Sequence, residues 1–152
     1  MGKNSFIEGV DFIKLVDYYF DFLDTDWHAC KVEEEIVGQF YYSITFQIPN
    51  AYNISINLEN AESYLDVVIF TLDHHGKEST WENSETYHLS QFNDYLKNKI
   101  TQKDHMTNKA FFQTYSKTTD IEKLLLGAAQ KLRLFLIYYL YGSNNVKQVS
   151  RK

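Results

Sequence analysis

Cysteine, proline and glycine are scarce in this sequence, and each shortage excludes a class of protein. The single cysteine, Cys30, cannot close a disulfide within the chain, so the cysteine content gives no sign of an oxidising compartment. One proline and six glycines leave little room for disordered linkers. A chain of 152 residues can bury about 70% of its unfolded surface and needs no disulfide or metal to fold. We therefore expect a single domain over residues 1–142, followed by a flexible basic tail over residues 143–152.

Long apolar runs are absent as well. The start of the chain has no apolar core of the kind found in secretory signal peptides, and the run from Leu132 to Tyr141 is too short to cross a bilayer. The sequence also lacks a phosphate-binding glycine loop, a nucleophile elbow, a metalloprotease helix motif and paired metal-binding cysteines. We therefore expect a cytoplasmic protein that does not enter the membrane, is not an enzyme and holds no cofactor.

Charge is distributed unevenly along the chain. Residues 1–98 hold seventeen Asp and Glu against five Lys, a balance of −12, and residues 99–152 hold three acids against ten Lys and Arg, a balance of +7. Either the two parts neutralise one another in the fold, or each sign marks a surface for a partner. Lysines and aromatic residues alternate near the end of the chain, but the sequence pI of 5.5 argues against nucleic-acid binding.

The sequence predicts two long helices, one near each end of the chain. Residues 119–141 begin with a capping box of Thr119 and Glu122, and Ser5 with Glu8 forms a similar box near the start. The apolar stripe of the last helix follows at intervals of three and four residues: Ile121, Leu125, Ala128, Leu132, Phe135 and Tyr139. The first helix carries the same kind of stripe: Phe6, Val10, Ile13, Val16, Phe20 and Leu23.

Strands are predicted between these helices. Residues 39–48 alternate apolar and polar side chains, with Phe40 on the apolar side, and residues 53–59 repeat the pattern after a turn, which favours an antiparallel hairpin. Residues 64–72 are apolar on both faces and predict a central strand. We therefore predict an α+β fold, an antiparallel sheet of four to five strands packed on one face by an N-terminal helix and a long C-terminal helix.

The remaining segments are less regular. Residues 27–37 read as a first strand, and residues 80–81 with residues 86–87, on either side of a polar insert, as a short edge strand. Ser90 is expected to cap a short helix over residues 91–102, and a last strand is favoured within residues 104–117.

A metal site near the first strand receives little support from the sequence. On a strand, Asp26, His28 and Cys30 would share one face, since they are two residues apart. Zinc sites, however, usually draw spaced pairs of ligands from two segments, and the chain has no second cysteine. We therefore predict no metal.

Acidic residues of the first third of the chain form the predicted binding site. Asp17, Asp21 and Asp24 would share one exposed face of the first helix, where like charges one turn apart disfavour the helix by a few tenths of a kcal/mol. Because this placement does not help the helix, it suggests a functional reason. The predicted partner-binding residues are Asp17, Asp21, Asp24, Asp26, Glu33, Glu34 and Glu35.

The order of helices and strands resembles, in architecture alone, that of small acidic secretion chaperones and some bacterial immunity proteins. From the charge we expect a protein-binding module, an inhibitor of the immunity type that neutralises a basic partner such as a toxin nuclease. The first alternative is a dimeric secretion-type chaperone whose subunits meet through the segment from Leu134 to Tyr141. Further alternatives are a nucleic-acid binder and an enzyme assembled in space from residues such as His28, His88 and Glu59.

Overall fold

The computed structural model describes residues 7–72 and 86–141, and the chain divides into two compact units, Met1–His88 and Leu89–Lys152. The fold is α+β, with a five-stranded antiparallel sheet, an N-terminal helix and a long C-terminal helix, which confirms the predicted fold class. The single domain over residues 1–142 stays a prediction, and the predicted tail and residues 80–81 of the predicted edge strand lie outside the described residues. Among the helices in the described ranges, none combines the length and the apolar character that crossing a membrane requires.

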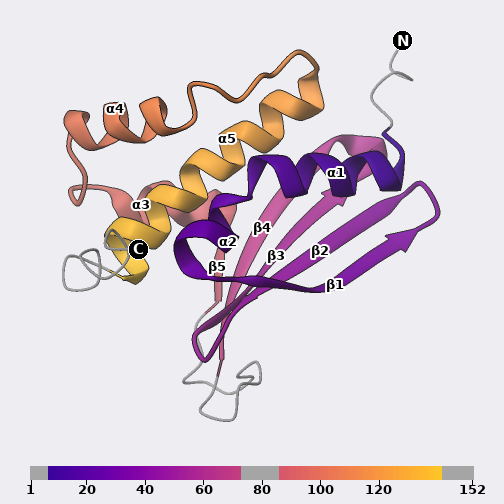
Figure 1. Ribbon diagram of the computed structural model, residues 1–152, viewed down its shortest axis with the longest axis horizontal. Helices are drawn as coiled ribbons and strands as arrows, with labels where there is room; N and C mark the ends of the chain where they lie inside the picture. Colours follow the sequence, from indigo (N-terminus) through magenta and orange to yellow (C-terminus); the bar gives the residue numbers. More distant parts are fainter. Residues whose placement is uncertain (1–6, 73–85, 142–152) are drawn as a thin grey trace. The chain divides into compact units, whose positions relative to one another are not determined.

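The sheet of the N-terminal unit follows the order of its strands in the chain (Figure 1). Each strand pairs antiparallel with the next: β1 (Cys30–Val37), β2 (Tyr41–Ile48), β3 (Tyr52–Glu59), β4 (Tyr64–Thr71) and β5 (Thr86–His88). The predicted hairpin is confirmed, and Ile48 lies opposite Tyr52 beside its turn. The first strand begins at Cys30, three residues later than predicted, because a helix continues through residue 27.

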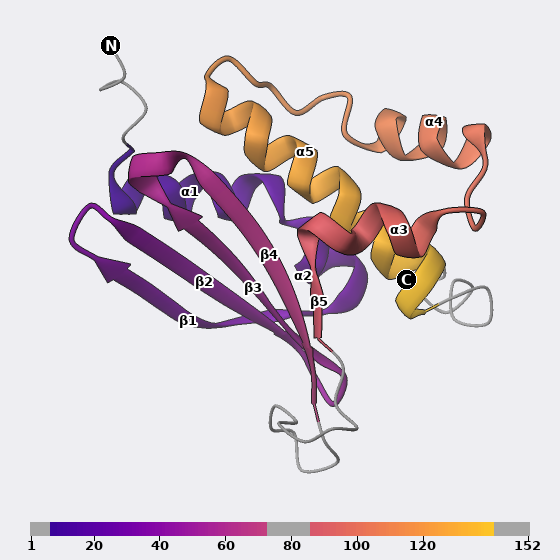
Figure 2. The same ribbon diagram turned by 180° about the vertical axis from the view of Figure 1, so that it is seen from behind.

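Alternating side chains give this sheet one apolar and one polar face. Tyr42, Ile44 and other apolar residues of β2 are buried on the face that carries α1 (Gly9–Tyr19), where the rings of Phe12 and Tyr42 lie 5.6 Å apart. Figures 1 and 2 show α1 lying across that face. On the outer face, Ser43 donates a hydrogen bond to Asn57 across the strands at 2.6 Å. The polar side chains of β2 and β3 therefore hydrogen-bond one another on this face.

The predicted first helix is interrupted. The helix α1 ends at Tyr19, and a second helix, α2, spans Phe22–Trp27. On one straight helix Phe20 and Phe22 would point about 200° apart, so only a break allows both rings to be buried. The predicted box of Ser5 and Glu8 does not start the helix, because Glu8 is the N-cap residue and makes no side-chain capping bond. Ser5 lies outside the described residues.

In the described part of the C-terminal unit the regular elements are helices joined by turns. After a 3₁₀ turn (Leu89–Gln91) come α3 (Phe92–Leu96), α4 (Gln102–Phe111), α5 (Asp120–Phe135) and a π-helical turn (Leu136–Leu140). The capping box of α5 is confirmed, since the Glu122 amide donates to Thr119 Oγ1 at 3.2 Å and the Thr119 amide donates to Glu122 Oε1 at 3.1 Å.

Two predictions for this unit were wrong. The helix expected over residues 91–102 ends at Leu96, and Ser90 lies in the 3₁₀ turn rather than at a helix cap. The strand favoured within residues 104–117 is instead α4 and the turn that follows it. A second capping box starts α4, because the Asp104 amide donates to Thr101 Oγ1 at 3.1 Å and the Thr101 amide donates to Asp104 Oδ2 at 2.8 Å.

Candidate protein-interaction surface

A groove of about 460 Å³ opens between α1, α2 and the start of β1. Asp17 from α1, with Asp21 and Asp24 from the beginning of α2, lines this groove. The apolar part of its lining includes Phe20 and Phe46, both of which are buried. The structure thus brings three of the predicted binding residues to one groove, although they do not lie on one straight helix as predicted.

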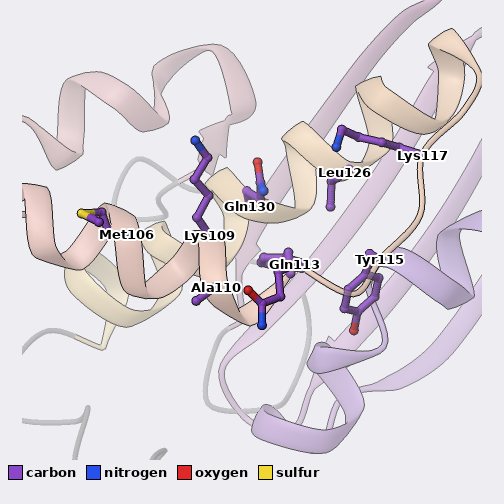
Figure 3. A pocket seen from close by; sticks show the side chains of 9 residues that line it. Met106, Lys109, Ala110, Gln113, Tyr115, Lys117, Leu126 and Gln130 are labelled. Atoms are coloured by element: carbon purple, nitrogen blue, oxygen red, sulfur yellow. The ribbon is translucent and has the colours of Figure 1, made fainter.

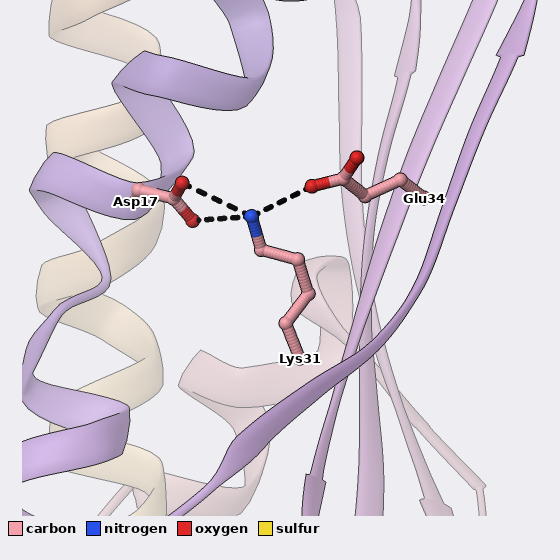
Figure 4. Close-up of polar contacts among 3 residues, drawn as sticks. All are labelled: Asp17, Lys31 and Glu34. Carbon is pink, nitrogen blue, oxygen red and sulfur yellow. Dashed lines mark hydrogen bonds and ion pairs between the residues drawn. The ribbon is translucent and has the colours of Figure 1, made fainter.

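Lys31 of β1 enters this groove and is held by carboxylates from two elements (Figure 4). Its ammonium lies 2.9 Å from Asp17 Oδ1 and 2.7 Å from Glu34 Oε2. Burial alone would lower the pKa of Lys31, but its hydrogen bonds to Glu34 and Asp17 outweigh burial and raise the pKa above the ordinary value of 10.5. Asp17, Asp21, Asp24 and Glu34 supply four negative charges and Lys31 one positive charge, so this side of the unit remains acidic.

The consecutive glutamates of β1 are divided between the two faces of the sheet. Glu33 and Glu35 lie opposite Thr45 and Ser43 on the outer face, whereas Glu34 points to the face that carries α1. All three are exposed. Counting only partners within residues that the structure describes, neither Glu33 nor Glu35 makes an ion pair or a side-chain hydrogen bond. Their charges are therefore presented to solvent without an internal counter-ion.

Asp26 lies inside α2 and does not line the groove. Its carboxylate is half-buried and accepts a hydrogen bond from Thr25 Oγ1 at 3.4 Å. The expected alignment of Asp26, His28 and Cys30 on one strand face is wrong, because α2 continues to Trp27 and His28 then adopts a left-handed conformation with φ of 58°. No group of three His, Cys, Asp or Glu side chains in the described part of the chain is arranged to hold a metal ion.

The strand β1 is the first strand of the sheet, and none of its eight residues is buried. Its register with β2 shifts between Lys31 and Glu33, which places a bulge at Val32. Three apolar side chains stand exposed beside the glutamates, Val32 at 52%, Ile36 at 48% and Val37 at 46%. We call residues 30–37 the β1 edge.

Two further apolar residues next to the β1 edge contradict the predicted core. Val10 is 56% exposed because it lies about 200° around α1 from the buried Phe12, and Phe40 is 69% exposed in the turn before β2. A Cβ atom added to Gly9 would come 2.8 Å from Cδ1 of Ile36, so the first turn of α1 lies directly against the β1 edge. Acidic and apolar side chains are therefore exposed side by side at this edge.

Two residues of the enzyme alternative, Glu59 and His88, lie apart on the sheet. Glu59 lies opposite Tyr64 on β4, whereas His88 lies opposite Val68, about 13 Å further along that strand. His88 Nδ1 lies 3.1 Å from Oδ2 of Asp66, a residue of β4. His28 lies after α2, outside the strands.

The segment of the dimer alternative is partly enclosed. Leu134, Phe135 and Leu136 are buried within the chain, and the side chains from Ile137 to Tyr141 are half-buried. The proposed subunit contact stays a prediction.

Comparison of the chain with protein-family models, curated proteins and solved structures finds no match. The function is therefore inferred from the groove and the β1 edge.

Proposed function

We propose that the protein is a cytoplasmic binding module that takes up a basic protein partner, in the manner of a small inhibitor of the immunity type. The binding surface consists of the groove and the β1 edge. One observation carries the proposal: exposed apolar side chains flank three consecutive exposed carboxylates along an outer strand that no other described strand covers. Protein interfaces combine apolar contact with charge in this way.

A simpler explanation accounts for only half of this surface. Charged side chains and bulges on an outer strand prevent unwanted pairing between sheets, and Glu33, Glu35 and the bulge at Val32 would serve that purpose. The exposed Ile36 and Phe40 would not, because large apolar side chains in water favour the association that the charges oppose. Charge and apolar area together favour a specific partner.

The groove suits a cationic side chain of such a partner. Lys31 demonstrates that an ammonium fits between carboxylates of α1 and β1, at 2.9 Å and 2.7 Å. Asp21 and Asp24 line the rest of the groove, whose volume exceeds that of one lysine or arginine side chain. A toxin nuclease that binds its own substrate through cations would offer the complementary surface, and charge attraction would speed the encounter.

The test begins with capture. The full-length chain is immobilised and exposed to a lysate of its source cell, and the captured protein is identified and purified. We then compare its affinity for the wild-type protein and for the double variant Asp24→Lys with Glu33→Lys, which changes one groove residue and one residue of the β1 edge. The matched control is Glu62→Lys with Asp94→Lys, two exposed acids outside this surface that change the net charge equally.

We expect the site variant to weaken binding about 100-fold, since close charge pairs in interfaces couple strongly, and the control to weaken it by less than about fivefold. Binding by the wild type should also weaken as salt rises. Equal losses in the two variants would indicate a general charge effect and contradict the proposed surface.

A further inference from the structure

The C-terminal unit holds a pocket of about 440 Å³ between α4, the segment that follows it and α5 (Figure 3). Its apolar lining includes Phe112 and Leu126, which are 2% and 5% exposed. Polar atoms come from the side chains of Lys109, Gln113 and Lys117 and from Gln130. A volume of this size falls in the range of small-molecule sites, which join an apolar lining to a few polar groups.

Buried contacts fix the spacing of the two helices that form this pocket. Asn108 of α4 is 4% exposed, and its Nδ2 donates to the Gln130 carbonyl oxygen at 3.0 Å. Its Oδ1 accepts a hydrogen bond from Arg133 Nη1 at 2.8 Å, and the same guanidinium lies 3.8 Å from the ring centroid of Phe111. Because these contacts tie α4 to α5, the pocket is formed before any ligand arrives.

The charge of the pocket has one sign. Lys109 and Lys117 line it, and no acidic residue does. In the part of the chain that the structure describes, neither ammonium makes an ion pair. In Figure 3 the two lysine side chains approach from opposite ends of the pocket, and their nitrogens lie on the same side as the amide of Gln130.

We propose that this pocket binds a small amphipathic anion, an aromatic or aliphatic body that bears one carboxylate, sulfonate or phosphate. The body lies against Phe112 and Leu126, and the anionic group lies between Lys109 and Lys117 with the Gln130 amide as a donor. Apolar burial supplies the affinity, and the two cations select a ligand with a negative end over a neutral one of the same shape. The site lies in the C-terminal unit and does not depend on the acidic surface of the N-terminal unit.

A matched pair of probes separates the contribution of apolar burial from that of the two lysines. Anilinonaphthalenesulfonate carries an aromatic body with a sulfonate, and N-phenylnaphthylamine has the same aromatic body without the charge. Fluorescence titration of the full chain is expected to give about tenfold tighter binding of the sulfonate, and this preference should shrink as salt rises. Amide NMR spectra with the sulfonate should show the largest shifts in residues 106–117 and 126–130.

Variants test the residues. The double variant Lys109→Gln with Lys117→Gln should weaken binding of the sulfonate about tenfold and leave binding of the neutral probe unchanged. The control is Lys123→Gln with Lys131→Gln, which changes two exposed lysines of α5 outside the pocket and should weaken the binding of neither probe. Ala110→Trp, at an exposed position in the lining, should fill the pocket and reduce the binding of both probes. Equal affinity for the two probes, equal effects of the two lysine pairs, or NMR shifts centred on the N-terminal unit would each overturn the proposal.

Discussion

Replacing Asn60 with alanine tests how the start of α1 is held to the sheet. Asn60 is fully buried at the end of β3. The Ile7 amide donates to Asn60 Oδ1 at 3.2 Å, and Asn60 Nδ2 donates to the carbonyl oxygens of Ile7 at 3.0 Å and Gln39 at 2.8 Å. The hydroxyl of Tyr42, whose pKa is raised mainly by burial and therefore keeps its proton, donates to the same Ile7 oxygen at 2.6 Å.

The expected loss follows from counting these bonds. Asn60→Ala removes four hydrogen bonds at a buried position, the fourth from Nδ2 to the Tyr42 hydroxyl at 3.2 Å. Because Nδ2 shares two hydrogens among three acceptors, we count about three full bonds, and at about 1 kcal/mol each the free energy of unfolding falls by about 3 kcal/mol. The matched control is Asn57→Ala on the outer face, where the amide oxygen accepts bonds from Ser43 and Ser55 at 2.6 and 2.9 Å. Ser43 is half-buried and Ser55 is buried, but their hydroxyls lie 3.3 Å apart and can still hydrogen-bond each other when Asn57 is replaced, so the control should lose only about 1 kcal/mol.

Urea unfolding followed by tryptophan fluorescence measures both variants, since both tryptophans belong to the unit Met1–His88. Asn60→Asp gives a second reading. The ionised carboxylate that this variant introduces would face the Ile7 and Gln39 carbonyls, so the folded-state pKa of this carboxyl group would rise above its unfolded value. The stability of the Asn60→Asp protein would therefore be highest below about pH 4 and fall as the pH rises through the folded-state pKa. If Asn60→Ala unfolds no more easily than Asn57→Ala, the network does not hold α1 as described.

Four further predictions concern the cap of α5, the α4–α5 contact and the groove. Thr119→Ala removes the oxygen that accepts from the Glu122 amide, so urea unfolding should show a loss of about 1 kcal/mol, and an unchanged midpoint would contradict it. Hydrogen bonds from the backbone amides before α5 lower the pKa of Glu122 from its ordinary 4.5. The contribution of Glu122 to the free energy of unfolding is therefore complete above about pH 4.5 and is lost as the pH falls through the lower folded-state pKa. Glu122→Gln should flatten this acid dependence, and parallel stability curves would refute the assignment. Asn108→Ala loses the hydrogen bond to the Gln130 carbonyl and the hydrogen bond from the Arg133 guanidinium, so thermal unfolding should show a loss of stability of about 2 kcal/mol. A loss below half that value would count against the α4–α5 contact. Lys31→Met should lose less than about 1 kcal/mol because its ion pairs are exposed, and should tighten binding of a basic partner, so weaker binding would contradict the assigned role of the groove.

Elements with a clear period or a complete end signal were predictable from the sequence. Residues 39–48 and 53–59 alternate with period two around a turn, and the register of β2 and β3 follows directly. The box of Thr119 and Glu122 starts α5 where the sequence placed it. Both signals are local, so no tertiary contact was needed to read them.

Other elements depend on contacts between distant residues or on a weaker signal. The break between α1 and α2 follows from the burial of Phe20 and Phe22, which compete for opposite sides of one helix. The helix α4 was missed because aromatic residues near its end suggested a strand, while its start signal uses Asp104 where a capping box usually has Glu or Gln. The exposure of Phe40 was hidden because the alternation of residues 39–48 begins before β2 does. The exposure of Val10 was hidden because Val10 fits the predicted apolar stripe although it lies within α1.

The site was predictable only in its composition. The sequence singles out the acidic residues, but not that Lys31, fourteen positions after Asp17, neutralises part of the charge. Alternation along the predicted strand already places Glu34 on the opposite face from Glu33 and Glu35. The sequence does not show which of these faces carries α1, because that follows from strand pairing and the bulge. The apolar residues of the β1 edge follow no single period and gave no signal of exposure.

The central claim is that the acidic β1 edge and groove bind a basic partner, and one measurement tests it most directly. The dissociation constant of the captured partner is measured by calorimetry, at low and at high salt, for the wild type, for Asp24→Lys with Glu33→Lys and for the control Glu62→Lys with Asp94→Lys. The account predicts tight wild-type binding that weakens with salt, about 100-fold weaker binding by the site variant and near wild-type binding by the control. A partner that binds all three proteins alike, with no dependence on salt, would contradict it.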